Sequence, residues 1–206
     1  MIIKRFTVGP LATNCYLAVC EQTGKSVVID PGGISDDLLD AIRDTKLTAV
    51  LLTHGHFDHI LGVPIIVGET GVPVQIHELD AHMLSDPVEN GSFMIGAEIT
   101  VPAASKTLTE GDIVTFGDSS LSVIYTPGHT PGGISFVDGD RSVLGGDTLF
   151  RMSVGRWDLP GGDYDTLMES LRLKFGALKD GVIVYPGHGE ETTIGFERMY
   201  NQFMRQ

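Results

Sequence analysis

Long apolar runs are missing from this 206-residue sequence, and none approaches the ~18 residues that a membrane-spanning helix requires. Strand-like residues begin directly at Met1, so we expect neither a signal peptide nor a transit peptide. Basic residues are also few: 14 Lys and Arg stand against 27 Asp and Glu, a formal net charge of −13. This balance argues against a nucleic-acid backbone as the main partner. We therefore expect one globular, cytoplasmic domain over residues 1–206, with no membrane or nucleic-acid partner.

Cysteine is scarce as well, and the two that are present lie in one strand-like run. Cys15 and Cys20 are five positions apart, which in a strand places them about 16 Å from each other and on opposite faces. A disulfide requires Cα atoms within roughly 7 Å. We expect both side chains to be reduced and buried as small apolar fillers, as is usual in cytosolic proteins.

Four potential metal ligands crowd one short segment of the chain. The apolar run 49–52 ends abruptly, and His54, His56, Asp58 and His59 follow within six residues. Imidazole suits zinc, iron and similar metals, and a carboxylate adds negative charge that holds them. A single loop cannot surround an ion. If this is a metal site, other parts of the chain must supply the remaining ligands.

Three further segments end in ligand-type residues. The runs 122–126, 142–144 and 182–185 are short, apolar or β-branched, and typical of buried strands. Each leads through glycine to a single candidate ligand, and these ligands are His129, Asp147 and His188. Glycine allows the backbone to turn sharply and to approach neighbouring groups closely. Four strand ends that each deliver a ligand indicate a metal site at the edge of a sheet.

The order of the predicted elements indicates two sheets. Strands are predicted over 2–8, 13–20, 25–30, 48–53 and 72–76, and again over 112–116, 120–126, 133–137, 142–144 and 182–185. Helices are predicted after Ser35 and over 58–69, 79–84, 163–178 and 193–203. In the second of these, Pro64 is expected either to kink the helix or to mark a later start. Residues 85–105 have no clear period and are expected to form a long binding loop or lid. Residues 150–162 are rich in glycine and are also expected to be irregular. Because the strands come in two batches, each followed by helix, we expect two sheets packed face to face with helices outside.

Together these motifs resemble the metallo-β-lactamase superfamily. The carrying residues are the HxHxDH loop from His54 to His59, then His129, Asp147 and His188, and the match extends over nearly the whole chain. The resemblance implies an α+β fold, a four-layer αβ/βα sandwich of two mixed β-sheets with the metals at one sheet edge. It is closest to glyoxalase II, the hydroxyacylglutathione hydrolases, in a compact form.

The resemblance implies two divalent metal ions, most commonly zinc, with iron and manganese as alternatives. By position, His54, His56 and His129 would hold one metal, and Asp58, His59 and His188 would hold the other. Asp147 would bridge them, and Asp58 would also orient the attacking hydroxide. Asp30, in the family's first motif, would orient a ligating histidine. The remaining histidines, His77 and His82, fall outside the pattern and are expected at the surface or in a helix.

The implied reaction is hydrolysis of a small-molecule thioester by a hydroxide that bridges the metals, with lactoylglutathione as the type of substrate. Glyoxalase II carries a C-terminal helical domain that helps to hold glutathione, whereas only 18 residues follow His188 here. Arg151 and Arg156 are therefore the candidates for gripping a substrate carboxylate, because Arg binds carboxylates bidentately. Tyr185 is a candidate pocket residue. The oligomeric state is not indicated by the sequence.

A rival hypothesis is a persulfide dioxygenase with a single iron, bound by two histidines and an aspartate. That family resembles this fold and shares a Gly-Arg-x-Asp stretch, here residues 155–158. The ending Gly-His-Gly-Glu-Glu at 187–191 is closer to the hydrolase. A third hypothesis is a metal-binding module that has lost activity, which the seven intact ligand positions disfavour.

Overall fold

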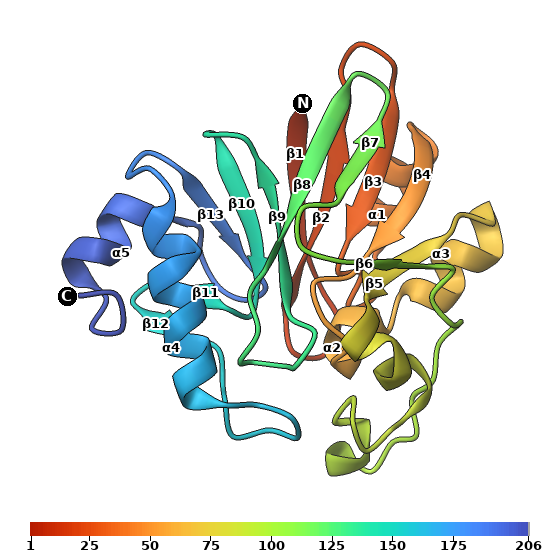
Figure 1. Ribbon diagram of the computed structural model, residues 1–206. Helices are drawn as coiled ribbons and strands as arrows, with labels where there is room; N and C mark the ends of the chain where they lie inside the picture. The colour runs from red at the N-terminus through yellow and green to blue at the C-terminus, as the bar shows by residue number, and fades with distance from the viewer. Residues whose placement is uncertain (206) are drawn as a thin grey trace.

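Two six-stranded sheets face each other in the computed structural model, which describes residues 1–205 (Figure 1). The first sheet contains, in spatial order, β1 (Ile2–Val8), β2 (Thr13–Val19), β3 (Lys25–Ile29), β4 (Lys46–Leu51), β5 (Val74–His77) and β6 (Lys106–Leu108). Its first three strands pair antiparallel and the rest pair parallel. This sheet is therefore mixed, as predicted.

The second sheet is also mixed. It contains, in spatial order, β14 (Thr192–Thr193), β13 (Ile183–Pro186), β10 (Ser142–Gly146), β9 (Ile134–Asp138), β8 (Ser119–Tyr125) and β7 (Ile113–Phe116). Only β10 and β13 pair parallel. A short hairpin of β11 (Leu149–Phe150) and β12 (Ser153–Val154) forms a third, two-stranded sheet.

Helices cover the outer faces of both sheets (Figure 1). The α-helices are α1 (Asp36–Arg43), α2 (Phe57–Ile60), α3 (Val63–Thr70), α4 (Tyr164–Leu173) and α5 (Ile194–Tyr200), and the 3-10 helices are η1 (Glu78–Ser85), η2 (Ser92–Ile95) and η3 (Phe175–Ala177). The result is the predicted α+β sandwich of four layers. None of the helices in residues 1–205 has the length and hydropathy of a membrane span.

Alternation along the strands separates three layers of core. On β3, Val27 and Ile29 point between the sheets, whereas Val28 points to the helices outside. The layer between the sheets is completed by β8 and β9 residues such as Val123 and Phe136, all almost fully buried. Each such side chain contributes about 1.5–3 kcal/mol when it leaves water. This inner layer fixes the distance between the two sheets and hence the width of their shared edge.

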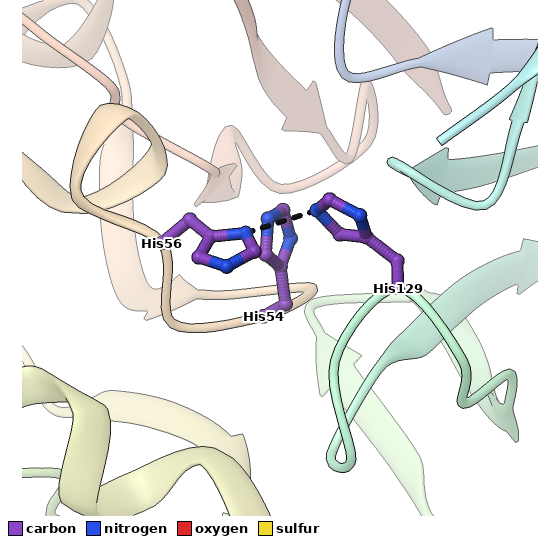
Figure 2. Close-up of side chains that lie close together, drawn as sticks. All are labelled: His54, His56 and His129. Carbon is purple, nitrogen blue, oxygen red and sulfur yellow. Dashed lines mark hydrogen bonds between the residues drawn. The ribbon is translucent and has the colours of Figure 1, made fainter. Parts of the chain in front are cut away.

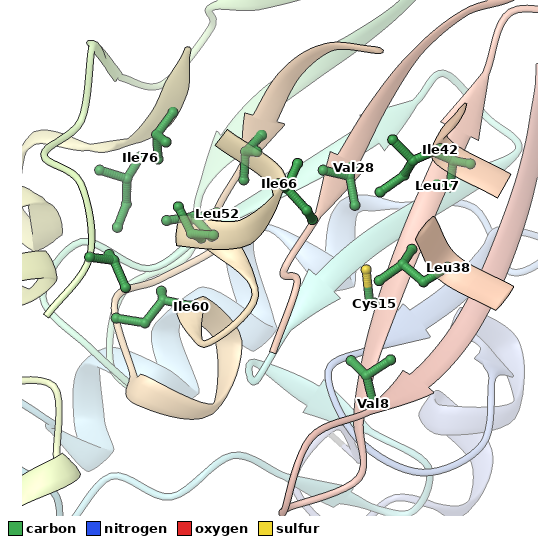
Figure 3. Packing of buried hydrophobic residues seen from close by; sticks show 14 of the residues in the cluster. Val8, Cys15, Leu17, Val28, Leu38, Ile42, Leu52, Ile60, Ile66 and Ile76 are labelled. Atoms are coloured by element: carbon green, nitrogen blue, oxygen red, sulfur yellow. The ribbon is translucent and has the colours of Figure 1, made fainter. Parts of the chain in front are cut away.

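The outer layers use the opposite faces of the same strands. Leu38 and Ile42 of α1 pack on Leu17 and Val28 of the first sheet (Figure 3). On the second sheet, Leu167 and Leu171 of α4 pack in the same way against strands β10 and β13. The cysteines obey the alternation. Cys15 lies in the outer layer and Cys20 in the inner one, both free and buried, as predicted.

The helix predicted over 58–69 is interrupted just before Pro64, the residue at which a kink or a late start was predicted. It forms two helices, α2 and α3, with a break at Gly62. The Gly62 N–H bonds to the carbonyl of Pro31 at 2.7 Å instead of continuing the helix. A Cβ at Gly62 would also lie 2.7 Å from the Gly33 oxygen. Pro64 then occupies the first turn of α3, where its missing N–H has no cost.

Two segments expected to be irregular contain local structure. The long loop over 85–105 includes η2, and the glycine-rich stretch over 150–162 begins with the β11–β12 hairpin. The predicted helix over 163–178 ends at Leu173 and continues as the 3-10 turn η3. The helix η2 and the β11–β12 hairpin both lie at the edge of the sandwich where the predicted ligands meet.

Candidate metal centre

All seven predicted ligands converge at one edge of the sandwich. His54 and His56 follow β4, and Asp58 and His59 lie in α2, one turn further on. Each of the remaining three follows the end of a second-sheet strand; these are His129, Asp147 and His188. A backbone bridge between Thr13 and His188 joins the two halves at this edge. Ligands that are up to 134 positions apart in the sequence thus share one site.

The first donor group contains His54, His56 and His129 (Figure 2). One nitrogen from each ring lies within 4.8 Å of the others, and His56 Nδ1 is 2.9 Å from His129 Nε2. The Nδ1 of His129 lies 2.6 Å from the carbonyl of Arg156, so it must carry the proton. The lone pair of its Nε2 is thereby left for a metal.

The second donor group contains Asp58, His59 and His188. His188 Nε2 lies 3.1 Å from Asp58 Oδ2, and His59 Nε2 lies 3.6 Å from the same oxygen. Thr13 Oγ1 donates a hydrogen bond to Asp58 Oδ2 at 3.2 Å, which fixes the carboxylate. The group therefore presents two imidazoles and one oriented carboxylate to a common point.

Asp147 lies between the two donor groups. Its Oδ2 is 3.6 Å from His129 Nε2 of the first group and 3.6 Å from His188 Nε2 of the second. Its Oδ1 is 3.4 Å from His59 Nε2. One carboxylate thus faces ligands of both groups, which is the position expected of a bridging ligand.

The unpaired polar atoms of the site fit a metal centre. Five of the six buried side-chain polar atoms without a hydrogen-bond partner in residues 1–205 belong to His54, His56, His59 and Asp147. One of the five, His59 Nδ1, faces the Asp30 carboxylate at 3.1 Å, and the other four belong to the donor side of the site. Buried polar groups are normally paired, so such a concentration requires an explanation. Divalent cations bound by nitrogen and oxygen donors supply one.

The electrostatics of the site are consistent with this fit. Burial lowers the pKa of His54 well below its usual value, and burial together with His129 lowers the pKa of His56 to about 3. Neutral imidazole is the form that binds metal. Burial would also lower the pKa of His59, but Asp147 and other carboxylates around it raise it well above its usual value. A cation would replace the proton that these carboxylates draw to His59.

Asp30 supports the ligands from behind. Its Oδ2 lies 3.1 Å from His59 Nδ1 and accepts a hydrogen bond from Thr53 Oγ1, while its Oδ1 accepts the Thr53 N–H. Thr53 Oγ1 in turn lies 3.0 Å from His54 Nδ1. Asp30 adopts a φ of 51°, a left-handed conformation that Asp tolerates better than most residues. Its predicted role of orienting a ligating histidine is therefore geometrically feasible.

Glycine is needed where the strand ends pass the ligands. A Cβ at Gly187 would lie 2.1 Å from Asp147 Oδ1 and 2.7 Å from His59 Cε1. At Gly146, with a φ of 51°, a Cβ would lie 2.3 Å from Thr53 Oγ1. Both glycines precede ligands in the sequence. Their small size lets backbone and ligands share the crowded edge.

Asp80 is a supporting residue that was not among the residues predicted for the site. It is fully buried and accepts hydrogen bonds from the Gly55 N–H at 3.2 Å, the Thr130 hydroxyl at 2.7 Å and the Gly132 N–H at 2.6 Å. Gly55 lies between two ligands of the first group, and Thr130 follows the third. Asp80 therefore ties together the two loops that carry this group, although no spacing in the sequence signals it.

A cavity of about 370 Å³ opens beside the donor groups. Of the three predicted substrate contacts, only Arg156 lines it. Arg151 lies outside the lining, with its guanidinium over the ring of Phe196 and 3.8 Å from Glu190. Tyr185 turns toward the core between the sheets and packs on Tyr16, with ring centroids 5.4 Å apart. The structure thus does not bring Arg151 and Tyr185 to the cavity where they were expected.

The two other histidines lie apart from the donor groups. His82 is exposed, as predicted. The expectation of a position at the surface or in a helix is wrong for His77, which is the buried last residue of β5. Its ring stacks on Tyr125 with ring centroids 4.7 Å apart. Its Nδ1 accepts the N–H of Leu79 and so caps η1. A histidine at a strand end is therefore not sufficient evidence for a ligand.

Family comparison agrees with this architecture and site. The sequence matches the family model of the metallo-beta-lactamase superfamily over residues 8–188, a span that includes every predicted ligand. The chain belongs to the metallo-beta-lactamase superfamily. This fold binds divalent metals, and members of the superfamily are mostly metal-dependent hydrolases.

Three solved structures resemble this metallo-beta-lactamase superfamily member over most of its length. The BLEG-1 B3 metallo-beta-lactamase is 38% identical, with a TM-score of 0.93 and full coverage of both chains. TTHA1623, in a di-iron-bound form, is 36% identical with a TM-score of 0.83, covering 97% of this chain and 99% of its own. ETHE1 from Myxococcus xanthus is 30% identical with a TM-score of 0.77, covering 98% and 84%.

A sequence relative carries a more specific name. The hydroxyacylglutathione hydrolase GloC of Haemophilus influenzae is 34% identical over 209 residues, which cover 99% of this chain and 98% of the relative. The similar proteins thus include, by name, a metallo-beta-lactamase, a protein in a di-iron-bound form and a hydroxyacylglutathione hydrolase. Their variety leaves the substrate to be argued from the site itself.

Proposed function

We propose that this chain is a binuclear metal-dependent hydrolase of small-molecule thioesters, with glutathione as a candidate thiol carrier. The position of Asp147 supports the proposal most strongly, because one carboxylate faces both His129 and His188, members of separate donor groups. Two donor groups joined by one carboxylate match the needs of two cations. The likeness to GloC supports the choice of a thioester.

The proposal gives each ligand a role. His54, His56 and His129 would hold one divalent metal, Asp58, His59 and His188 would hold the other, and Asp147 would contact both. Zinc is our first choice, and iron and manganese accept the same mixed donors. When bound, such metals lower the pKa of water toward 7 and polarise a carbonyl. The residues of the chain must then position the reactants.

Hydrolysis requires no nucleophilic side chain under this proposal. Water attacks the carbonyl carbon, a C–O bond forms, the C–S bond breaks, and the products are a carboxylate, a thiol and one proton. Asp58, held by the Thr13 hydroxyl and next to His188, is the carboxylate placed to orient the attacking water. Arg156 lines the cavity and is the candidate for binding a carboxylate of the thiol carrier.

The rival reaction is oxygen-dependent oxidation of a persulfide at one iron. The likeness to ETHE1 and the Gly-Arg-x-Asp stretch over 155–158 support this hypothesis. A single iron held by two histidines and an aspartate would, however, leave four of the seven converging donors without a role. Within the described residues, the two donor groups and the shared Asp147 therefore favour the hydrolase.

One preparation can separate the two reactions. Protein loaded with zinc and, in a parallel sample of the same preparation, with iron is supplied with lactoylglutathione and, separately, with a glutathione persulfide, while thiol release and oxygen uptake are followed. We expect thiol release without oxygen uptake. Asp147→Ala should lower the turnover number by orders of magnitude, whereas the exposed His82→Ala should not. Oxygen-dependent turnover of the persulfide with no thioester hydrolysis would establish the rival reaction.

A further inference from the structure

The cavity beside the metal centre has a predominantly apolar wall. Its lining away from the predicted ligands is formed mainly by Leu11, Phe57, Met94, Ile95, Phe150, Val154 and Leu159. Three of these side chains are largely exposed at the rim: Met94 is 65% accessible, Ile95 57% and Leu11 53%. Apolar side chains gathered at the mouth of a cavity mark a place where a ligand or partner removes them from water.

The segment that presents Met94 and Ile95 is held firmly in place. It is the olive-green turn η2 in the lower right of Figure 1. Asn90, fully buried, donates from Nδ2 to the carbonyls of Met83 at 3.0 Å and Ile99 at 2.8 Å. The Asn90 carbonyl accepts the Phe57 N–H at 2.9 Å, directly beside the ligand loop. These hydrogen bonds therefore hold the apolar rim in a defined position next to the metal centre.

Positive charge at the cavity is limited. Arg156 is the one Lys or Arg in its lining, and its guanidinium donates to both carboxylate oxygens of Asp158, at 2.9 and 3.0 Å. The formal net charge of the chain is −13. Apart from the proposed metal ions, an anionic group in the cavity would meet one cation, Arg156, which is already paired with Asp158. An uncharged aliphatic group would instead cover the exposed apolar rim.

We propose that the preferred substrate is a thioester with an aliphatic substituent, which lies across Leu11, Met94 and Ile95 while the thioester faces the metal centre. This inference rests on the proposed thioester hydrolysis and names its substrate class. The apolar substituent is either the acyl group or the S-alkyl group, since both flank the reacting carbon. The apolar side chains of this wall offer no hydrogen bond to the hydroxyl of a lactoyl group.

A chain-length series tests the proposal on the metal-loaded enzyme. In one arm, the acyl group is lengthened from acetyl through butanoyl to hexanoyl on N-acetylcysteamine. In the other, the S-alkyl group is lengthened on a fixed acetyl. In one of the arms, kcat/KM should rise about fourfold per methylene, equivalent to the ~0.8 kcal/mol of a buried CH₂. The arm that rises identifies the substituent.

Substitutions at the rim should remove this dependence. We expect the double variant Met94→Ser, Ile95→Ser to lower the hexanoyl-to-acetyl ratio of kcat/KM by about tenfold, equivalent to ~1.4 kcal/mol of lost apolar contact. Both side chains are exposed, so the fold does not depend on them. The matched control is Met199→Ser with Val88→Ser, which are 62% and 55% accessible and do not line the cavity. The control should keep the wild-type ratio.

Binding separates failure of this inference from failure of the proposed function. Calorimetric titration with acetate, butanoate and hexanoate, and with alkanethiols of matching length, needs no turnover. Length-dependent binding without any thioester hydrolysis would refute the function and keep the apolar site. Hydrolysis with a flat length series, or with lactoylglutathione preferred over the aliphatic thioesters, would refute the inference and keep the function.

A second copy of the chain is the other occupant that could cover this rim. Light scattering of the wild type and of the double variant tests it. The inference predicts the same mass for both proteins. If the wild type were a dimer that dissociated when Met94 and Ile95 were replaced, the rim would be a subunit interface, and the proposed substrate contact would be wrong.

Discussion

The carboxylate of Asp30 lies 3.1 Å from Nδ1 of His59, on the side of the ring opposite the donor group. The carboxylate also accepts two hydrogen bonds from Thr53, the residue before the first ligand of the loop. One side chain at the end of β3 therefore orients ligands of both donor groups. Partners of this kind fix the ring orientation and raise the basicity of a ligating histidine.

We predict that Asp30→Asn lowers metal affinity by roughly tenfold to a hundredfold, the usual effect of losing such a partner. Asn keeps the shape and tolerates the left-handed backbone at this position, so the change removes charge rather than fold. Competition with a chromophoric chelator measures the affinity. Asp37→Asn, on the exposed side of α1, is the control and should bind metal normally. Equal affinities for both variants would contradict the role assigned to Asp30.

Gly187→Ala should displace Asp147 and reduce the amount of bound metal. The new Cβ would lie 2.1 Å from Asp147 Oδ1 and cannot be accommodated without movement of that carboxylate. Gly181→Ala precedes the same strand, and its Cβ meets nothing within 4 Å, so it serves as a matched control. Elemental analysis should show less metal in the first variant and normal metal in the second. Full loading of Gly187→Ala would show that Asp147 is not needed where we place it.

Glu197 should stabilise the wall of the cavity through α5. It is fully buried, and it accepts hydrogen bonds from the Met152 N–H at 2.8 Å, the Thr192 hydroxyl at 2.5 Å and the Asn201 amide at 2.8 Å. Met152 lies in the turn of the β11–β12 hairpin, which lines the cavity. Glu197→Ala leaves these donors unpaired and should cost about 3 kcal/mol of unfolding free energy in urea denaturation. The exposed Glu169→Ala should cost little, and equal midpoints for the two variants would argue against this role.

Metal removal should lower thermal stability. A ligand present at a hundred times its dissociation constant stabilises the native state by about 2.7 kcal/mol. For a chain of this length each kcal/mol corresponds to roughly 2–4 °C, so chelation should lower Tm by roughly 5–10 °C for each metal ion that is lost. Scanning calorimetry before and after EDTA, with zinc added back, measures the shift. A Tm that does not move although the metal has been removed would mean that the buried donors are stable unpaired.

The sequence predicted the sandwich and the convergence of the ligands because both follow from local patterns. Strand alternation determines which residues of β3 enter the core. The strand ends that lead to the predicted ligands lie at the same edge of the two packed sheets. A ligand placed just after a strand, such as His129 or His188, is therefore carried to that edge. Gly187, just before His188, is needed for the predicted reason: its backbone passes too close to Asp147 to leave room for a Cβ.

Other features depend on contacts that no local pattern encodes. Asp80 bonds to groups around residues 55 and 130, far away in the sequence, and nothing near it marks it as a support. The break at Gly62 exists because Pro31 lies across it. Tyr185 was expected near substrate, but its register on β13 turns it toward Tyr16. The apolar rim at Met94 arises from the way Asn90 folds an aperiodic loop back on itself.

The number of metal ions held by one chain tests the central claim most directly. Wild-type protein is stripped, loaded with excess zinc, freed of unbound metal and analysed for zinc and protein. Two donor groups that share Asp147 predict about two zinc ions per chain, falling when Asp147 is changed to Ala. A wild-type protein that stays at one metal per chain under excess zinc would contradict the binuclear site and favour the single-iron dioxygenase.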